Sequence, residues 1–112
     1  MKERRIQPRI RLKASAQIAV RNHTIKCVSC ENISEGGMCV VVKETPPLHG
    51  HGIIEVSIKN RRMKASFSSP CHFLWHRPIS PNGKNHYLGI RFTETDEANQ
   101  QKISTILASL TP

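Results

Sequence analysis

The sequence is poor in aromatic residues and has no long apolar run. Among its 112 residues there are one Trp, one Tyr and three Phe, so aromatic side chains make up only 4%. A surface that stacks the bases of single-stranded nucleic acid needs several exposed aromatic rings. The longest apolar run, from Met38 to Val42, is far shorter than the roughly 20 residues of a transmembrane helix or the roughly 7–15 of a signal peptide. We therefore expect a soluble cytoplasmic protein with no membrane segment, and nucleic acid is the weaker candidate partner.

Acidic residues are also scarce. Asp and Glu number 8 against 17 Lys and Arg, so the formal net charge is 17 − 8 = +9. More than half of this excess lies in residues 1–13, where Glu3 is accompanied by the basic residues Lys2, Arg4, Arg5, Arg9, Arg11 and Lys13. Pro8 prevents a helix from running through this segment. We interpret residues 1–13 as a flexible basic arm that attracts phosphate, or as a solvated tail that binds polyanions in general.

Several kinds of catalytic or metal site are missing from the sequence. We find no plausibly placed carboxylate pair, no phosphate-binding glycine loop and no Ser/His/Asp set, so we expect no enzyme activity. Cys27 and Cys30 have the C-x-x-C spacing, but the second pair of ligands that a structural zinc site needs is absent. If they lie on one strand, their side chains point to opposite faces. We therefore expect no metal and four free thiols, with a zinc-stabilised interaction module as an open alternative.

The pattern of the chain after the arm predicts an all-β domain with a terminal helix. Short runs rich in Val and Ile, separated by turn residues, predict an antiparallel sheet of six strands in a sandwich or small barrel. The fifth run contains Pro70, where we expect a bend or bulge. The predicted strands are Ser15–Val20, Thr24–Asn32, Gly37–Lys43, Ile53–Ile58, Met63–Trp75 and Tyr87–Phe92.

The last residues change to a helical period. Ile103, Ile106, Leu107 and Leu110 fall on one face of a helix predicted from Asp96 to Leu110, with Asp96 or Thr95 as its N-cap. We expect this helix to pack on the sheet. The predicted organisation is an arm (1–13), a barrel (14–95) and a helical segment (96–112) that belongs to the same domain.

Two short motifs occur together in this chain. Arg5 and Arg9 form R-x-x-x-R, and Asn32, Ser34 and Gly37 form N-x-S-x-x-G some 20–30 residues later. Each motif alone is weak, because Asn and Ser are common in turns and Gly36 and Gly37 also suit a backbone with positive φ. At this separation, and followed by Trp75 and the run Tyr87–Phe92, the motifs resemble the PilZ family of cyclic di-GMP receptors. The resemblance implies a six-stranded antiparallel β-barrel with an accessory helix and no catalytic activity.

The resemblance assigns ligand contacts to Arg4, Arg5, Arg9, Asn32, Ser34, Gly36 and Gly37. The residue chemistry suits cyclic di-GMP, because an Arg fork bonds phosphate or the O6/N7 edge of guanine, while Asn32 and Ser34 oxygens accept from guanine N1 and N2. Gly37 would let the backbone approach closely. Trp75, His76 and Arg77 are possible additional contacts, or a solvated strand end.

The resemblance also bears on stoichiometry and partners. In the family an Arg just before R-x-x-x-R accompanies two intercalated ligands, so Arg4 implies two cyclic di-GMP molecules per domain and no other cofactor. Binding would order the arm and create a surface for an unidentified downstream protein in motility, exopolysaccharide production or attachment. We expect a monomer or homodimer. The alternative function is a small basic barrel that binds single-stranded nucleic acid.

Overall fold

The computed structural model describes residues 10–11, 13–59, 64–93 and 96–110. The arm residues Arg4, Arg5 and Arg9 lie outside these ranges. The described strands are β1 (Ile10–Arg11), β2 (Ala14–Val20), β3 (His23–Lys26), β4 (Ser29–Ile33), β5 (Gly37–Val42), β6 (His51–Lys59), β7 (Lys64–Pro78) and β8 (His86–Phe92). One helix, α1 (Glu97–Leu110), follows them.

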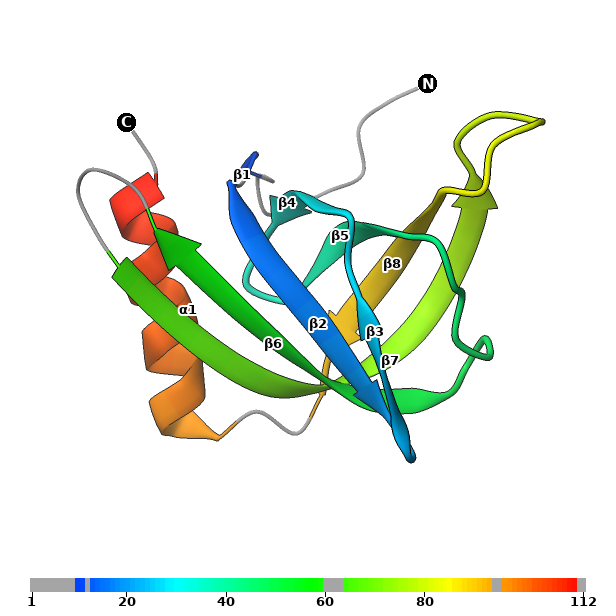
Figure 1. Cartoon of the computed structure of the whole chain (residues 1–112). Coiled ribbons are helices and arrows are strands. Elements are labelled where there is room, and N and C mark those ends of the chain that lie inside the picture. Colours follow the sequence, from blue (N-terminus) through cyan, green and yellow to red (C-terminus); the bar gives the residue numbers. More distant parts are fainter. Residues whose placement is uncertain (1–9, 12, 60–63, 94–95, 111–112) are drawn as a thin grey trace, which may run out of the picture.

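All strand pairs are antiparallel, and the sheet has the order β1-β4-β5-β8-β7-β6-β2-β3. The sheet curls round on itself, so that β2 and β6 face β5 and β8 across the core (Figure 1). Among the described residues β1 and β3 are its two edges. The predicted class, mainly β with a C-terminal helix, is confirmed, although the strands form a curled, incompletely closed sheet rather than a simple six-stranded barrel.

The predicted second strand, Thr24–Asn32, is in fact two strands. At Cys27 the backbone N–H still bonds to Ala16 of β2 (3.0 Å), whereas the N–H of Val28 bonds to Val41 of β5 (2.7 Å). The chain therefore changes pairing partner between two consecutive residues. A single apolar run in the sequence does not reveal such a corner, because neither period nor composition changes there.

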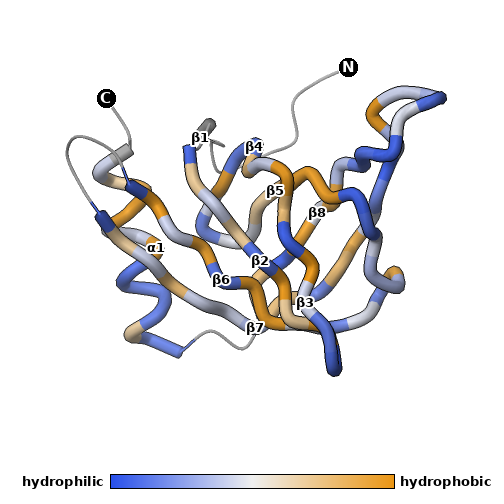
Figure 2. Tube along the Cα trace, in the orientation of Figure 1, coloured by the Kyte–Doolittle hydropathy of each residue, from blue (hydrophilic) through white to orange (hydrophobic). Residues whose placement is uncertain are grey.

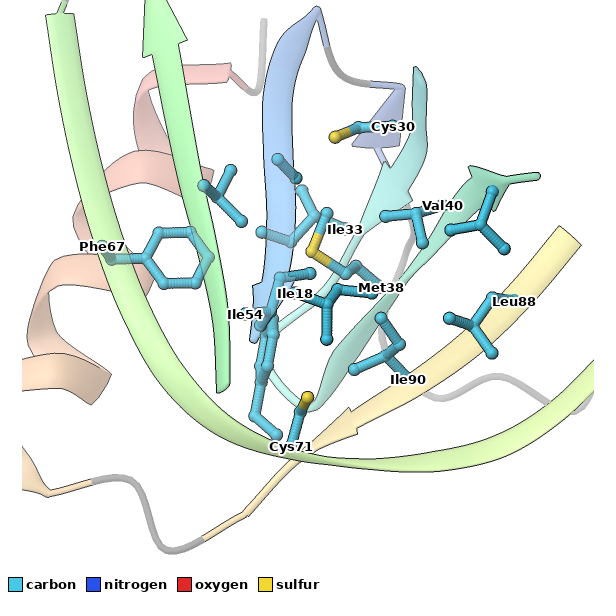
Figure 3. Packing of buried hydrophobic residues seen from close by; sticks show 14 of the residues in the cluster. Ile18, Cys30, Ile33, Met38, Val40, Ile54, Phe67, Cys71, Leu88 and Ile90 are labelled. Atoms are coloured by element: carbon cyan, nitrogen blue, oxygen red, sulfur yellow. The ribbon is translucent and has the colours of Figure 1, made fainter. Parts of the chain in front are cut away.

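Side chains on one face of the curled sheet form the core (Figure 3). They come from every long strand, and fully buried members include Ile18, Ile33, Met38, Val40, Val42, Ile54, Val56, Ile58, Cys71, Phe73 and Leu88. Figure 2 shows the complementary pattern, with the tip of the β2–β3 hairpin coloured hydrophilic. Core-facing and outward-facing side chains alternate along a strand, because successive side chains point to opposite faces of the sheet.

Helix α1 begins beside β7 and adds its apolar face to the same core (Figure 1). The predicted N-cap is confirmed, since Asp96 Oδ1 accepts the backbone N–H of Asn99 at 2.8 Å. Ile103 and Ile106 are buried and Leu107 packs against the cluster, as the spacing predicted. The described helix is too short and too polar to cross a membrane.

The strand β7 passes through Pro70 without interruption. The carbonyl of Pro70 accepts the N–H of Thr93 (2.9 Å), one residue beyond the end of β8. The N and C=O of a strand residue point the same way, so the Pro70 nitrogen also points toward Thr93. This position lies beyond the last residue of β8, where no N–H is needed for strand pairing. The predicted irregularity at Pro70 is wrong in position, since the register shift lies between Phe73 and Trp75.

Gly37 is the tightest point between β5 and β8. A Cβ there would lie 2.0 Å from the backbone oxygen of Ile90, and no described glycine has a positive φ. Gly37 is therefore needed for close strand pairing and not for an unusual backbone conformation.

We expect Gly37→Ala to lower the free energy of unfolding by about 2–3 kcal/mol, because β5 and β8 must separate to admit a methyl group. Urea denaturation measures this change. Gly36→Ala is the matched control, since Gly36 is exposed and should cost less than about 1 kcal/mol. Equal effects of the two substitutions would contradict this role of Gly37.

Candidate functional site

The basic arm joins the sheet beside the Asn-x-Ser strand. Ile10 pairs with Ile33, and Arg11 pairs with Asn32. Two residues that the sequence assigned to the flexible arm thus form strand β1. Arg9 is the covalent neighbour of Ile10, so the R-x-x-x-R motif leads directly into β1, which pairs with the strand that carries Asn32. The structure thereby connects two motifs that are more than 20 residues apart in the sequence.

The second motif forms the end of β4 and the turn into β5. The Ser34 N–H donates to the carbonyl of Gly37 at 2.8 Å, and the Ser34 hydroxyl lies 3.4 Å from the same oxygen. The Gly36 carbonyl accepts the N–H of Phe92 from β8 at 2.8 Å. The turn is therefore held from both sides, and a Ser34 hydroxyl that donates to Gly37 keeps its lone pairs available as acceptors.

Two register shifts set which side chains face outward. In β4 the shift lies between Cys30 and Asn32, and in β7 it lies between Phe73 and Trp75. Cys30 and Phe73 are buried in the core. Because the bulge adds one residue, Asn32 and Trp75 project on the opposite side, which we call the outer face.

Asn32 and Trp75 belong to the same row across the sheet. The pairings run from Arg11 to Asn32, then to Cys39, Gly89 and Trp75. At about 4.8 Å per strand, three strand spacings separate Asn32 from Trp75, or about 14 Å. The two residues between them have small side chains or none. We call this set the outer-face row.

Trp75 lies flat across Gly89. A Cβ on Gly89 would be 2.3 Å from Cε2 and Nε1 of the indole, and Gly89 is buried while Trp75 is 38% exposed. The guanidinium carbon of Arg77 is 5.9 Å from the centre of the Trp75 ring and 5.6 Å from that of Tyr87. The result is an aromatic platform with a cation at its side, an arrangement suited to stacking a planar base.

His76 is not part of this platform. It pairs with Leu88, a core residue, so its side chain projects on the face opposite to Trp75 and Arg77. Its ring contacts that of His86 at 5.8 Å. Of the three additional contacts suggested by the sequence, the structure brings together Trp75 and Arg77 only.

The cysteines behave as buried thiols in this structure. Cys27 lies at the corner between β3 and β4, and both it and Cys30 reach the core cluster. The two cysteines do not lie on one strand, so the condition under which they would point to opposite faces is not met. Burial raises the pKa of the Cys27 thiol to about 12, with a further contribution from Cys30, and burial raises the pKa values of Cys30 and Cys71 to about 11. Within the described ranges no three His, Cys, Asp or Glu side chains are arranged to hold a metal.

A cavity of about 660 Å³ lies away from the outer-face row. It is bounded by β2, β3, β6, β7 and Lys102 of α1, and none of the residues predicted as ligand contacts lines it. Pocket size therefore does not locate the candidate site, which is a shallow surface defined by the row.

These features define a small antiparallel β-domain whose candidate site lies on the outer face of the sheet. A family model for the PilZ domain matches residues 3–109, and the chain belongs to this family. A search of curated proteins finds no match.

Solved structures share this fold. The inhibitor of motility MotI/DgrA of Bacillus subtilis superposes with a TM-score of 0.75 at 15% identity, covering 96% of this chain and 52% of that one. The PilZ domain of YcgR from Escherichia coli, solved with c-di-GMP, gives 0.72 at 16% identity, with 96% and 92% covered. The MrkH–c-di-GMP complex of K. pneumonia gives 0.70 at 16% identity, with 97% and 53% covered. The chain thus spans about half the length of MotI and MrkH.

We expect Gly89→Ala to displace the Trp75 indole, because the new methyl group occupies the position of the ring. Trp75 is the single tryptophan, so its fluorescence reports this change alone. The emission maximum should move to longer wavelength. Gly83→Ala is the control, because its Cβ would meet only the flexible side chain of Ser80. An unchanged spectrum for Gly89→Ala would contradict the described contact.

Proposed function

We propose that this chain is a receptor for cyclic di-GMP, which it binds on the outer face between the N-terminal arm and the strand end that carries Asn32. The observation that carries the proposal is the outer-face row, in which the end of the basic arm, Asn32 and the Trp75 platform lie on adjoining strands. Family membership supports the same ligand, since two of the similar structures contain c-di-GMP.

The chemistry of the row matches the two parts of a guanine nucleotide. The Asn32 carbonyl and the Ser34 hydroxyl provide acceptors for the N1 and N2 hydrogens of guanine. Arg5 and Arg9 of the arm provide planar donor pairs for phosphate or for the O6/N7 edge of the base. The exposed face of Trp75, with Arg77 beside it, offers a surface on which a second base stacks.

In this proposal the protein acts as a switchable adaptor and catalyses no reaction. Among the described residues Ile10 and Arg11 of the arm pair with β4, and ligand contacts would add to what holds the arm against the sheet. Arm and ligand together then present a new surface to a downstream protein. The description of MotI as an inhibitor of motility supports motility machinery as one class of target.

A calorimetric titration tests the ligand assignment. We expect saturable binding of cyclic di-GMP, much weaker binding of cyclic di-AMP, which lacks a donor at the N1 edge, and no saturable binding of a single-stranded oligonucleotide. Arg5→Ala and Arg9→Ala should each weaken cyclic di-GMP binding by roughly 1.5–3 kcal/mol, the value of a lost charge-assisted hydrogen bond.

Lys64→Ala is the matched control for these arginine variants, since it removes one positive charge at the far end of β7. It should leave binding within about twofold of wild type. Tight binding of the oligonucleotide in preference to cyclic di-GMP would overturn the assignment in favour of nucleic acid. Wild-type affinity in both arginine variants would remove the arm from the site.

We further propose that Arg4 allows two stacked ligands to bind per domain. Two cyclic di-GMP molecules carry four phosphate charges, and an additional guanidinium offsets part of their repulsion. Titration at protein concentrations well above the dissociation constant should reach saturation near two equivalents for wild type and near one for Arg4→Leu. A wild-type endpoint of one equivalent would exclude the second ligand and leave the receptor assignment intact.

A further inference from the structure

A second row of polar side chains crosses the outer face next to the first. Its pairings run from Gly37 of β5 to Arg91 of β8, then to His72 of β7 and His51 of β6. On β8, Arg91 lies two residues beyond Gly89, so the two rows are about 7 Å apart. This histidine–arginine row begins at the last residue of the Asn-x-Ser-x-x-Gly motif.

The two histidines of this row are stacked. The rings of His51 and His72 are 4.7 Å apart with an interplanar angle of 13°, and His49 places a third ring 6.0 Å from His72. Nε2 of His72 lies 3.1 Å from the carbonyl oxygen of His49. A carbonyl only accepts, so Nε2 carries the hydrogen of the neutral ring. A proton taken up by His72 therefore goes to Nδ1 and creates a second donor.

The charged groups around this pair are almost all basic. Arg91 faces His72 from β8, His51 faces it from β6, and His49 faces it from the loop before β6. Glu35 is exposed in the turn next to Gly37, and it forms no ion pair with Arg91 or His72. In the described part of the chain the one histidine–carboxylate pair is His23 with Glu44, on other elements.

We infer that Arg91, His72 and His51 form an anion-binding subsite that becomes stronger when one imidazole of the stack is protonated. Histidine changes its charge between about pH 5 and pH 8, and an anion stabilises the protonated ring. The fixed guanidinium of Arg91 provides binding at every pH.

The inference rests in part on the proposed function. When a ligand is bound over Gly89 and Trp75, the side chains of the histidine–arginine row would reach one of its phosphates. A phosphodiester keeps one negative charge across this range of pH. Any change in its affinity between acidic and neutral pH therefore reports protonation of the protein. The site would make ligand binding tighter in a mildly acidic cytoplasm.

Two titrations at about pH 5.5 and about pH 7.5 test the subsite. In the first, sulfate is added and the imidazole C–H resonances are followed by NMR. Sulfate should shift the His51 and His72 resonances more strongly at the lower pH than at the higher pH, where Arg91 supplies the positive charge. In the second, cyclic di-GMP should bind about three- to tenfold more tightly at the lower pH.

Substitutions separate the subsite from general effects of pH. His72→Gln keeps an N–H at the position of Nε2, so the bond to His49 can persist, but it should reduce the pH effect on cyclic di-GMP affinity to less than about twofold. Arg91→Gln should weaken binding at both pH values. His23→Gln is the control, since His23 is paired with Glu44 elsewhere, and it should keep the full pH effect.

The outcomes distinguish the two proposals. If cyclic di-GMP fails to bind at either pH while sulfate shifts the histidine resonances, the receptor assignment fails and the anion subsite stands. If cyclic di-GMP binds equally at both pH values, or His72→Gln keeps the wild-type pH effect, the subsite is wrong and the receptor assignment stands.

Discussion

The close contact between β5 and β8 is the constraint on which the candidate site depends. Gly37 and Ile90 approach so closely that no side chain fits between them. These two strands are neighbours in the interior of the sheet, with the motif strand β4 next to β5 and the tryptophan strand β7 next to β8. Any widening between β5 and β8 would therefore move Asn32 away from Trp75. The glycine of the motif thus acts through the framework that supports the binding surface.

A second glycine, Gly89, has a related role within the outer-face row. Gly89 leaves room for the indole of Trp75 to lie against the backbone, and the indole in turn covers a strand position that has no side chain. The two glycines thus set the geometry of the surface in different ways, Gly37 through strand spacing and Gly89 through the orientation of the ring. A flat surface of this kind has little enclosed volume, and the cavity bounded by β2, β3, β6 and β7 lies elsewhere.

The positive charge of the outer face depends on the scarcity of acidic residues as much as on the presence of basic ones. Because the chain has few carboxylates, no acidic side chain among the described residues forms an ion pair with Arg91 or with the stacked histidines. A cation without a partner is available to an anionic ligand, whereas a paired cation must first lose its partner. In the proposed subsite the histidine stack lies beside the guanidinium of Arg91, so an imidazole that takes up a proton would add a second positive charge to a permanent one.

The amino-acid sequence by itself determined where most of the strands and the helix lie along the chain. Short runs rich in Val and Ile located most of β2, β5, β6 and β8, and the spacing of Ile103, Ile106 and Leu107 together with Asp96 located the helix and its cap. These signals are local, because each depends on residues within a few positions of one another. Each of the two motifs is also local, but their occurrence together at this separation gave the resemblance to the PilZ family, which implied a nucleotide ligand.

Only the tertiary structure decided how these elements are used. The change of partner at Cys27 and Val28, the bulge before Trp75 and the stacking of His51 on His72 all depend on strands distant in sequence. A bulge of one residue reverses the facing of every side chain that follows, so the outward position of Trp75 cannot be read from the pattern of its own strand. Pairing across the sheet, which no local pattern encodes, placed Arg11, Asn32, Gly89 and Trp75 in one row.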